Sequence, residues 1–218
     1  MKIIHEDSQI LVCYKESGLP VQSARVGTKD MVSMLKTYLW EKGGSGKEPY
    51  LGVIHRLDQP VEGVVVFAKT AQAAASLSEQ IRNGSMQKIY HAVVRKNRND
   101  IPDQGLLINY LLKESKGNSS KIVPEKTTGA KQAELEYRIL KKSAGNEKKR
   151  MALVQIHLHT GRHHQIRVQM AGADMPLYGD RKYGIVSPED SKSPLALCAV
   201  SLCFHHPKSK ELVTFTCE

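Results

Sequence analysis

The stretch HRLDQPVEGVVVFAKT, residues 55–70, joins a polar turn to an apolar run. The run is typical of a buried strand, which we expect from Gly63 to Ala68. Gly63, at the start of this run, permits either an unusual backbone angle or the close approach of another group. Arg56 and Asp58 precede the run, and Pro60 stiffens the turn between them and the strand. The pattern predicts an ionised carboxylate at the strand's entrance, with an ordinary surface ion pair as the alternative.

The charge balance of the chain is strongly basic. Its 218 residues include 32 Lys and Arg against 22 Asp and Glu, which gives a formal net charge of +10. A surface of this kind attracts polyanions, so nucleic acid is the expected partner. An anionic membrane is the weaker alternative, because no continuous basic amphipathic helix stands out.

The sequence shows neither a membrane-spanning segment nor a signal peptide. No apolar run approaches the roughly 20 residues that cross a bilayer. The first residues, MKIIHEDSQI, carry His, Glu and Asp where a signal peptide has its apolar stretch. We therefore expect a cytoplasmic protein with no membrane partner.

Strand and helix patterns alternate irregularly along the chain. Apolar or alternating segments predict strands over 10–14, 63–68, 86–96, 151–160, 195–207 and 211–218. Helical patterns are expected after Thr28 or Asp30, over 70–85, and in the segment that follows Gly161. Many hairpins and no regular βαβ rhythm argue for an α+β fold. We expect one domain over residues 1–218, with a largely antiparallel mixed β-sheet flanked by helices and loops.

A second informative stretch is HTGRHHQIRVQMAGADMPLYGDRKYG, residues 159–184. If a helix starts at Arg162, this residue lies in the first turn and Gln165 follows at helical spacing. His163 and Arg167 are four residues apart and would then share one face. An arginine that projects from such a helix over a sheet edge is a candidate partner for the carboxylate of residue 58.

Several histidines near this stretch raise the question of a metal site. His157 and His159 are expected on one face of a strand, and His163 and His164 follow closely. No carboxylate or Cys stands at ligand spacing beside them in the sequence. We therefore expect no metal site, and assign these side chains to hydrogen bonding or RNA contact.

The two stretches, together with KIYHAVV at 88–94, resemble the RluA-type pseudouridine synthases of the RluA/RsuA superfamily. Any one motif is moderate evidence, whereas their order and spacing together are strong. The resemblance extends from Ile10 through the closing LCFHHPKSKELVTF and covers nearly the whole chain. It implies the pseudouridine synthase fold and a catalytic domain alone, without the small N-terminal RNA-binding domain of some relatives. We expect a monomer with no obligatory protein partner.

The resemblance also implies roles for individual residues. Asp58 matches the catalytic aspartate, Tyr90 the tyrosine that stacks on the target base, and Arg167 the arginine that pairs with the aspartate. Arg56 matches an arginine that helps to displace the target nucleotide, and Leu197 or a neighbour would lie in the apolar floor of the pocket. The complete set expected to bind substrate is Arg56, His55, Arg162, His164, Gln165 and Leu197.

The implied activity is isomerisation of specific uridines in structured RNA, rRNA or tRNA, to pseudouridine, without metal or cofactor. A non-catalytic RNA-binding or ribosome assembly factor on the same fold is the alternative. A metal-dependent nuclease is disfavoured by the lack of a carboxylate cluster. The sequence departs from the commoner family pattern at Val61-Glu62, Gln169 and Cys198, which bears on the substrate more than on the chemistry.

Overall fold

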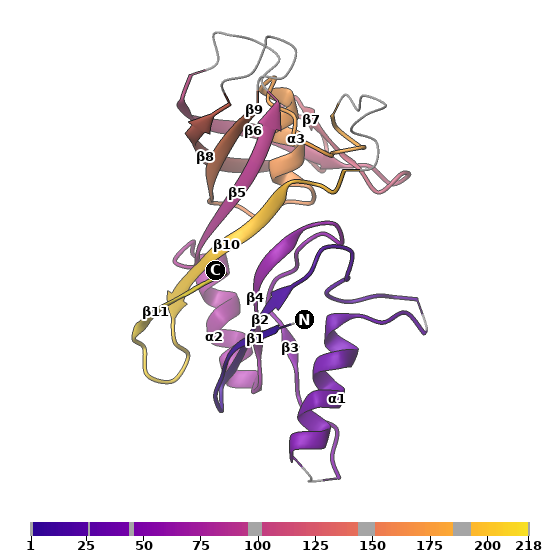
Figure 1. The fold of residues 1–218 in the computed structure, drawn as a ribbon, viewed down its shortest axis with the longest axis vertical. Helices are drawn as coiled ribbons and strands as arrows, with labels where there is room; N and C mark the ends of the chain where they lie inside the picture. Colours follow the sequence, from indigo (N-terminus) through magenta and orange to yellow (C-terminus); the bar gives the residue numbers. More distant parts are fainter. Residues whose placement is uncertain are drawn as a thin grey trace. The chain divides into compact units, whose positions relative to one another are not determined.

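The computed structural model describes residues 2–25, 27–43, 46–95, 102–143, 151–184 and 193–217. The chain divides into two compact units (Figure 1). Unit 1 comprises Met1–Gln87 and Ala199–Glu218, and unit 2 comprises Lys88–Cys198. Whether 1–218 acts as a single domain stays a prediction.

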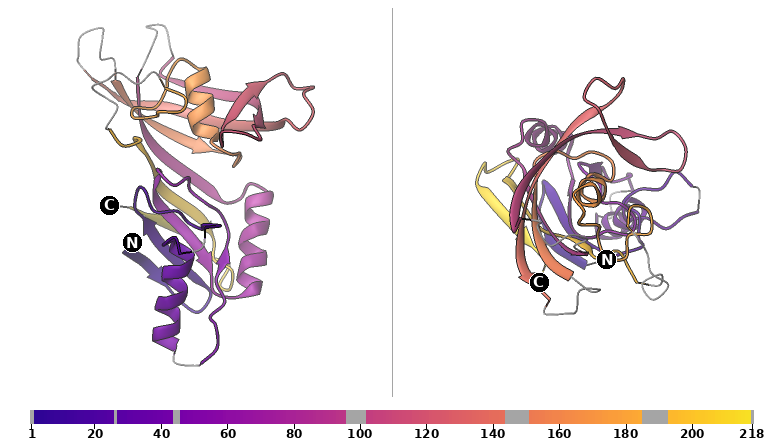
Figure 2. Two further views of the ribbon diagram at one scale, coloured as in Figure 1. Left: turned by 90° about the vertical axis from the view of Figure 1, so that its right-hand side faces the viewer. Right: turned by 90° about the horizontal axis from the view of Figure 1, so that it is seen from above.

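Unit 1 is a mostly antiparallel sheet with two helices beside it (Figures 1 and 2). Strand β2 pairs with β1 on one side and β4 on the other, β10 follows β4, β11 pairs with β10, and the short β3 pairs with β4. The elements are β1 (Lys2–Glu6), β2 (Ile10–Lys15), α1 (Met31–Gly43), β3 (Gly52–Val53), β4 (Glu62–Ala68), α2 (Ala71–Arg82), β10 (Leu197–His205) and β11 (Leu212–Thr216).

The apolar run of β4 is buried on both faces, as the sequence predicts. Val64 and Val66 pack with Ala73 and Leu77 of α2, while Phe67, whose side chain points to the opposite face, is fully buried as well. A continuous apolar strand suits this position, because neither face meets water. The strand therefore lies at the centre of the hydrophobic core of unit 1.

Side-chain caps fix the starts of both helices in unit 1. Asp30, not Thr28, caps α1, because its Oδ1 accepts a hydrogen bond from the backbone N–H of Ser33 at 2.7 Å. Thr70 caps α2 by accepting from the N–H of Ala73 at 3.1 Å. Both helices were expected from sequence. Of the two residues that the sequence offered as the start of α1, Thr28 and Asp30, the structure uses Asp30.

Unit 2 is an antiparallel sheet in the order β5-β9-β8-β6-β7. Helix α3 packs on β6 and β7, as both views in Figures 1 and 2 show. The elements are β5 (Gln87–Arg95), β6 (Gln104–Lys113), β7 (Ser120–Val123), β8 (Lys131–Lys142), β9 (Met151–Leu158) and α3 (Gln165–Gly172). The α+β class and the antiparallel character expected from sequence are confirmed. Among the helices in the described ranges, none is long and apolar enough to cross a membrane.

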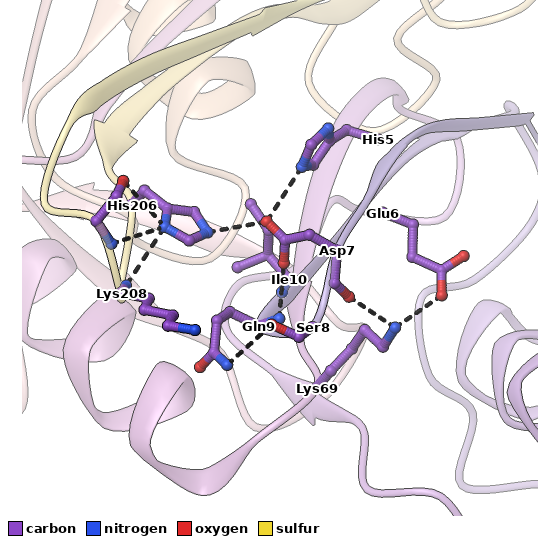
Figure 3. Close-up of polar contacts among 10 residues, drawn as sticks. His5, Glu6, Asp7, Ser8, Gln9, Ile10, Lys69, His206 and Lys208 are labelled. Atoms are coloured by element: carbon purple, nitrogen blue, oxygen red, sulfur yellow. Dashed lines mark hydrogen bonds and ion pairs between the residues drawn. The ribbon is translucent and has the colours of Figure 1, made fainter. Parts of the chain in front are cut away.

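A partly buried carboxylate ties three segments of unit 1 together (Figure 3). Oδ1 of Asp7 accepts hydrogen bonds from the N–H groups of Gln9 at 2.6 Å and Ile10 at 2.8 Å. Its Oδ2 lies 2.9 Å from Nε2 of His206, in the turn after β10, and its backbone carbonyl accepts from Nζ of Lys69 at 2.7 Å. Burial alone would raise the pKa of Asp7, but these hydrogen bonds outweigh it and lower the pKa to about 2.

We expect Asp7 to make unfolding pH-dependent in a defined window. Because its folded pKa is depressed, the stabilisation is complete above the unfolded value of 3.8 and is lost as the pH falls towards 2. After a discount for a side chain that is 32% exposed, Asp7→Asn should cost about 1–2 kcal/mol at pH 7. Urea unfolding of wild type and variant at pH 7 and pH 3 should show this difference shrinking at pH 3.

The matched control is Glu48→Gln, which removes an exposed carboxylate paired with Lys36. It should leave the free energy of unfolding unchanged within the error of the measurement at either pH, because an exposed ion pair contributes little. If Asp7→Asn behaves like this control, the Asp7 contacts add nothing to stability.

Candidate active site

The predicted catalytic aspartate lies in a tight turn of unit 1. Asp58 is partly buried, and its carbonyl accepts a hydrogen bond from the N–H of Val61 at 3.0 Å. The carbonyl of the next residue, Gln59, accepts from Nζ of Lys15 and from the N–H of Gly18, both at 2.9 Å. The turn before β4 is therefore clamped by the segment that follows β2, which fixes the backbone of the carboxylate.

Lys15 is a buried charge that the sequence analysis did not identify. Its side chain is fully buried, and Nζ also donates to the carbonyl of Glu16 at 3.1 Å. Burial lowers the pKa of Lys15 to about 8, against the opposing influence of Asp58 and Glu62. The negative charge of Asp58 thus favours the charged form of Lys15. A lysine at the end of an apolar strand, ILVCYK, was the available signal.

Two neighbours of Asp58 are fixed by backbone contacts. Gly63 has φ +125°, and a Cβ there would overlap the backbone of Ala199, so both possibilities raised by the sequence hold at once. The imidazole Nε2 of His55 accepts a hydrogen bond from the N–H of Val66 at 3.2 Å and so anchors the loop to β4. Arg56 is exposed between these two anchored residues.

In unit 2, Arg167 forms a bidentate ion pair with Asp180. Nε donates to Oδ2 and Nη2 to Oδ1, both at 2.8 Å, and both residues are buried. Burial would raise the pKa of Asp180, but the hydrogen bonds from Arg167 lower it below its usual value. Oδ1 also accepts from the N–H groups of Lys182 and Tyr183, so the loop after α3 folds around this carboxylate.

Tyr183 links this ion pair to the start of α3. Its hydroxyl accepts from the N–H of Ser120 at 2.8 Å and lies 2.7 Å from Nδ1 of His164. Cζ of Arg167 lies 5.1 Å from the centre of the Tyr183 ring, within range of a cation–π interaction. Burial, followed by the charge of Arg167, lowers the pKa of His164 to about 3, so its imidazole is neutral at physiological pH.

The helix begins later than the sequence analysis expected. Arg162 does not lie in a first helical turn, because His164 takes a left-handed conformation with φ 54° and α3 starts at Gln165. The side chain of Gln165 holds the preceding turn instead, since its Oε1 accepts from the N–H of Arg162 at 2.9 Å and from Oγ1 of Thr160 at 2.8 Å. The guanidinium of Arg162 donates from Nε to the carbonyl of Gln132 at 2.8 Å.

The expected face shared by His163 and Arg167 is also wrong, because His163 precedes the helix. Its Nδ1 lies 2.8 Å from Oγ of Ser120, and its ring stacks on that of His164 with centroids 3.8 Å apart. Further along α3, the buried side chain of Gln169 donates from Nε2 to the carbonyls of the sheet beneath it. This departure from the commoner family pattern therefore anchors the helix on β6 and β8.

The remaining predicted residues lie on strands. Tyr90 is buried on β5 and Leu197 is buried at the start of β10. The structure thus gathers His55, Arg56 and Asp58 in one loop of unit 1. In unit 2 it gathers a second group at the β9–α3 junction, made of Arg162, His164, Gln165 and Arg167.

Residues that sequence reasoning missed complete this second group. Asp180 and Tyr183 both belong to YGDRKYG, which the sequence marked only as a glycine-punctuated turn. An acidic residue inside a basic, glycine-rich segment was the signal that could have identified the partner of Arg167.

The four histidines considered as metal ligands separate into two groups. His163 and His164 are engaged with Ser120 and Tyr183, as described above. His157 and His159 lie beside Glu136 of β8, so that potential ligand atoms of all three residues are within 4.8 Å of one another. The expectation that no carboxylate lies at ligand spacing from these histidines is therefore wrong. Glu136 is distant from them in sequence but lies beside them across the sheet.

Comparison with known proteins agrees with this architecture. Residues 9–172 match the family model described as RNA pseudouridylate synthase. The chain is 31% identical to an "Uncharacterized RNA pseudouridine synthase" of Aquifex aeolicus (strain VF5), covering 100% of this chain and 69% of the relative. It is 31% identical to "Ribosomal large subunit pseudouridine synthase C" of Buchnera aphidicola subsp. Baizongia pistaciae (strain Bp), covering 98% of this chain and 65% of the relative.

A solved structure shares the fold over the full chain. "Human RNA Pseudouridylate Synthase Domain Containing 4" superposes with a TM-score of 0.79 at 26% identity, covering 100% of this chain and 88% of that one. The chain thus spans about two thirds of the two curated relatives, with shares of 69% and 65%. The family match over 9–172 and these similarities show that the chain belongs to the RluA-type RNA pseudouridine synthases, a family of isomerases.

Proposed function

We propose that this chain converts specific uridines in structured RNA, rRNA or tRNA, to pseudouridine, with Asp58 as the catalytic carboxylate and with no metal or cofactor in the reaction. The family match over residues 9–172 is the observation that carries the proposal. The Buchnera relative is named for the large ribosomal subunit, which supports rRNA as one substrate class.

The reaction detaches uracil from its ribose, rotates it and rejoins it through carbon 5. One fixed carboxylate is enough for this, either to attack the sugar or to abstract a proton, and both roles require its ionised form. The clamped turn and the buried ammonium of Lys15 support Asp58 in that role, because they fix its backbone and favour its negative charge.

Arg167 and Tyr90 complete the proposed chemistry. We assign to Arg167 the opposite charge that keeps Asp58 ionised, and to Tyr90 the flat surface on which the displaced base stacks. A guanidinium has five N–H donors, and the ion pair with Asp180 uses only those on Nε and Nη2. Asp180 is therefore a positioning residue, which fixes the plane of the Arg167 guanidinium without consuming all of its donors.

Recognition of RNA follows from charge and from access to the base. With 32 basic residues against 22 acidic ones, the chain attracts phosphates without regard to sequence. The target base must leave its stack before Asp58 can act, which costs a few kcal/mol in a paired region. We propose that Arg56, exposed two residues before Asp58, takes the place of the displaced nucleotide.

Asp58→Asn should lower the rate of pseudouridine formation by about a thousandfold or more, which amounts to loss of the activity. Its RNA affinity should stay within about threefold of the wild-type value. Tritium release from labelled uridine measures the first quantity and filter binding the second. Glu62→Gln is the matched control, because Glu62 is a second carboxylate whose charge acts on Lys15. Substantial turnover by Asp58→Asn would contradict the assignment, and an inactive wild type that still binds RNA would favour the non-catalytic alternative.

Asp180→Asn should lower the single-turnover rate, on the order of a hundredfold, because Arg167 loses one of its two carboxylate contacts. RNA affinity should hardly change. The rate is normalised to the folded fraction from urea unfolding, since breaking a buried ion pair also costs stability, about 3–5 kcal/mol when one partner is removed outright. A wild-type rate per folded molecule would mean that Asp180 supports only the fold.

Arg56→Ala should impair the reaction most where the uridine starts inside a helix. The comparison is the single-turnover rate on a folded stem-loop and on a short unstructured RNA with the same target context. A much larger loss on the stem-loop supports displacement of the nucleotide. Equal losses on both substrates would mean that Arg56 positions Asp58 or a phosphate instead.

A further inference from the structure

The outer face of the unit 2 sheet carries a cluster that the isomerisation does not use. Glu136 of β8 lies directly opposite His157 of β9 in the strand register. His159 follows two residues later on the same side of the chain, and its backbone N–H donates to the carbonyl of Glu134 at 3.2 Å. Three potential ligands are therefore presented from two neighbouring strands whose register is fixed by hydrogen bonds.

The distances within this cluster suit a small divalent ion. Nε2 of His159 lies 3.3 Å from Oε1 of Glu136, and the rings of His157 and His159 have centroids 4.4 Å apart. One potential ligand atom from each residue lies within 4.8 Å of the other two. Ligands at zinc–nitrogen and zinc–oxygen distances of about 2.0–2.1 Å in a tetrahedron stand roughly 3.3 Å apart, so small side-chain rotations would complete the set.

The burial of the His159 ring nitrogen fits the same role. Nε2 of His159 is shielded from water but makes no hydrogen bond within the described part of the chain, although the Glu136 carboxylate lies near it.

We propose that Glu136, His157 and His159 bind a divalent transition metal ion of the zinc class, with a water in the remaining position. Two imidazoles and one carboxylate are a known zinc ligand set, and such ligands also suit Co²⁺. The ion would join β8 to β9 and stabilise unit 2. It would take no part in the isomerisation, so binding of the metal and formation of pseudouridine are separable.

Glu136 and His157 also line a hollow of about 490 Å³ on this sheet. Its other lining residues include Ile89, Gln104, Leu106 and Arg138. The hollow opens two of the three ligands, Glu136 and His157, to an ion from solvent.

The test uses the full chain, stripped of metal with a chelator and then dialysed. Addition of Zn²⁺ at about 100 times the dissociation constant should raise the melting temperature by at least about 4 °C. Addition of Co²⁺ should produce the visible absorption bands of a four-coordinate ion. His157→Asn, His159→Asn and Glu136→Gln should each weaken Co²⁺ binding at least tenfold. His91→Asn, which alters another histidine of unit 2, is the matched control and should bind as wild type does.

Wild-type protein without the Zn²⁺ shift and without the Co²⁺ bands would overturn the proposal. Equal binding by all four variants would do the same, because it would locate the ion elsewhere. Circular dichroism of the metal-free variants identifies any that fail to fold. In that case the imidazole ¹⁵N resonances of the wild type decide, since zinc must shift those of His157 and His159 and leave that of His91 in place. Tritium release measured in EDTA tests the proposed function separately, and we expect it to be unchanged.

Discussion

The contact between the backbones of Gly63 and Ala199 determines where β4 can begin. No side chain fits between them, and the positive φ of Gly63 is one that few other residues adopt. Once β4 is seated there, its apolar run must be buried on both faces, and α2 covers the face that carries Val64 and Val66. The turn that carries Asp58 leads directly into this strand. The position of the carboxylate is therefore a consequence of how closely two backbones approach.

Buried charges in both units are held by geometry that offsets the cost of removing them from water. Lys15 donates to the carbonyls of Glu16 and Gln59, and Arg167 donates twice to Asp180. A buried charge without such partners would cost several kcal/mol, so each of these groups restricts the backbone around it to one arrangement. Such rigidity suits the proposed reaction, in which one carboxylate acts without a cofactor. The buried charges lower stability, but they fix the orientation of the groups around them.

The histidines of unit 2 show how one residue type serves different purposes in different surroundings. His164 is held in a left-handed conformation between His163 and Tyr183, where burial and the charge of Arg167 keep it neutral. His157 and His159 stand instead at a sheet surface next to a carboxylate from the adjacent strand. The first pair is fully engaged in shaping the turn before α3. The second pair has the chemistry of a ligand set, which is why we propose a metal ion there and not at the proposed catalytic residues.

Local pattern by itself determined much of this protein. The apolar run of β4, the helices α1 and α2 and the α+β class follow from hydrophobic periodicity and capping residues, which act over a few neighbouring positions. The motifs around Asp58, Tyr90 and Arg167 also identified the family, because their order along the chain is preserved. Tertiary structure alone decided that α3 starts at Gln165 and not at Arg162, since the Gln165 side chain closes the turn after β9. It alone joined Arg167 to Asp180 and Glu136 to the histidines of β9, because these partners are set by loop closure and strand register, and neither is encoded in the spacing of adjacent residues.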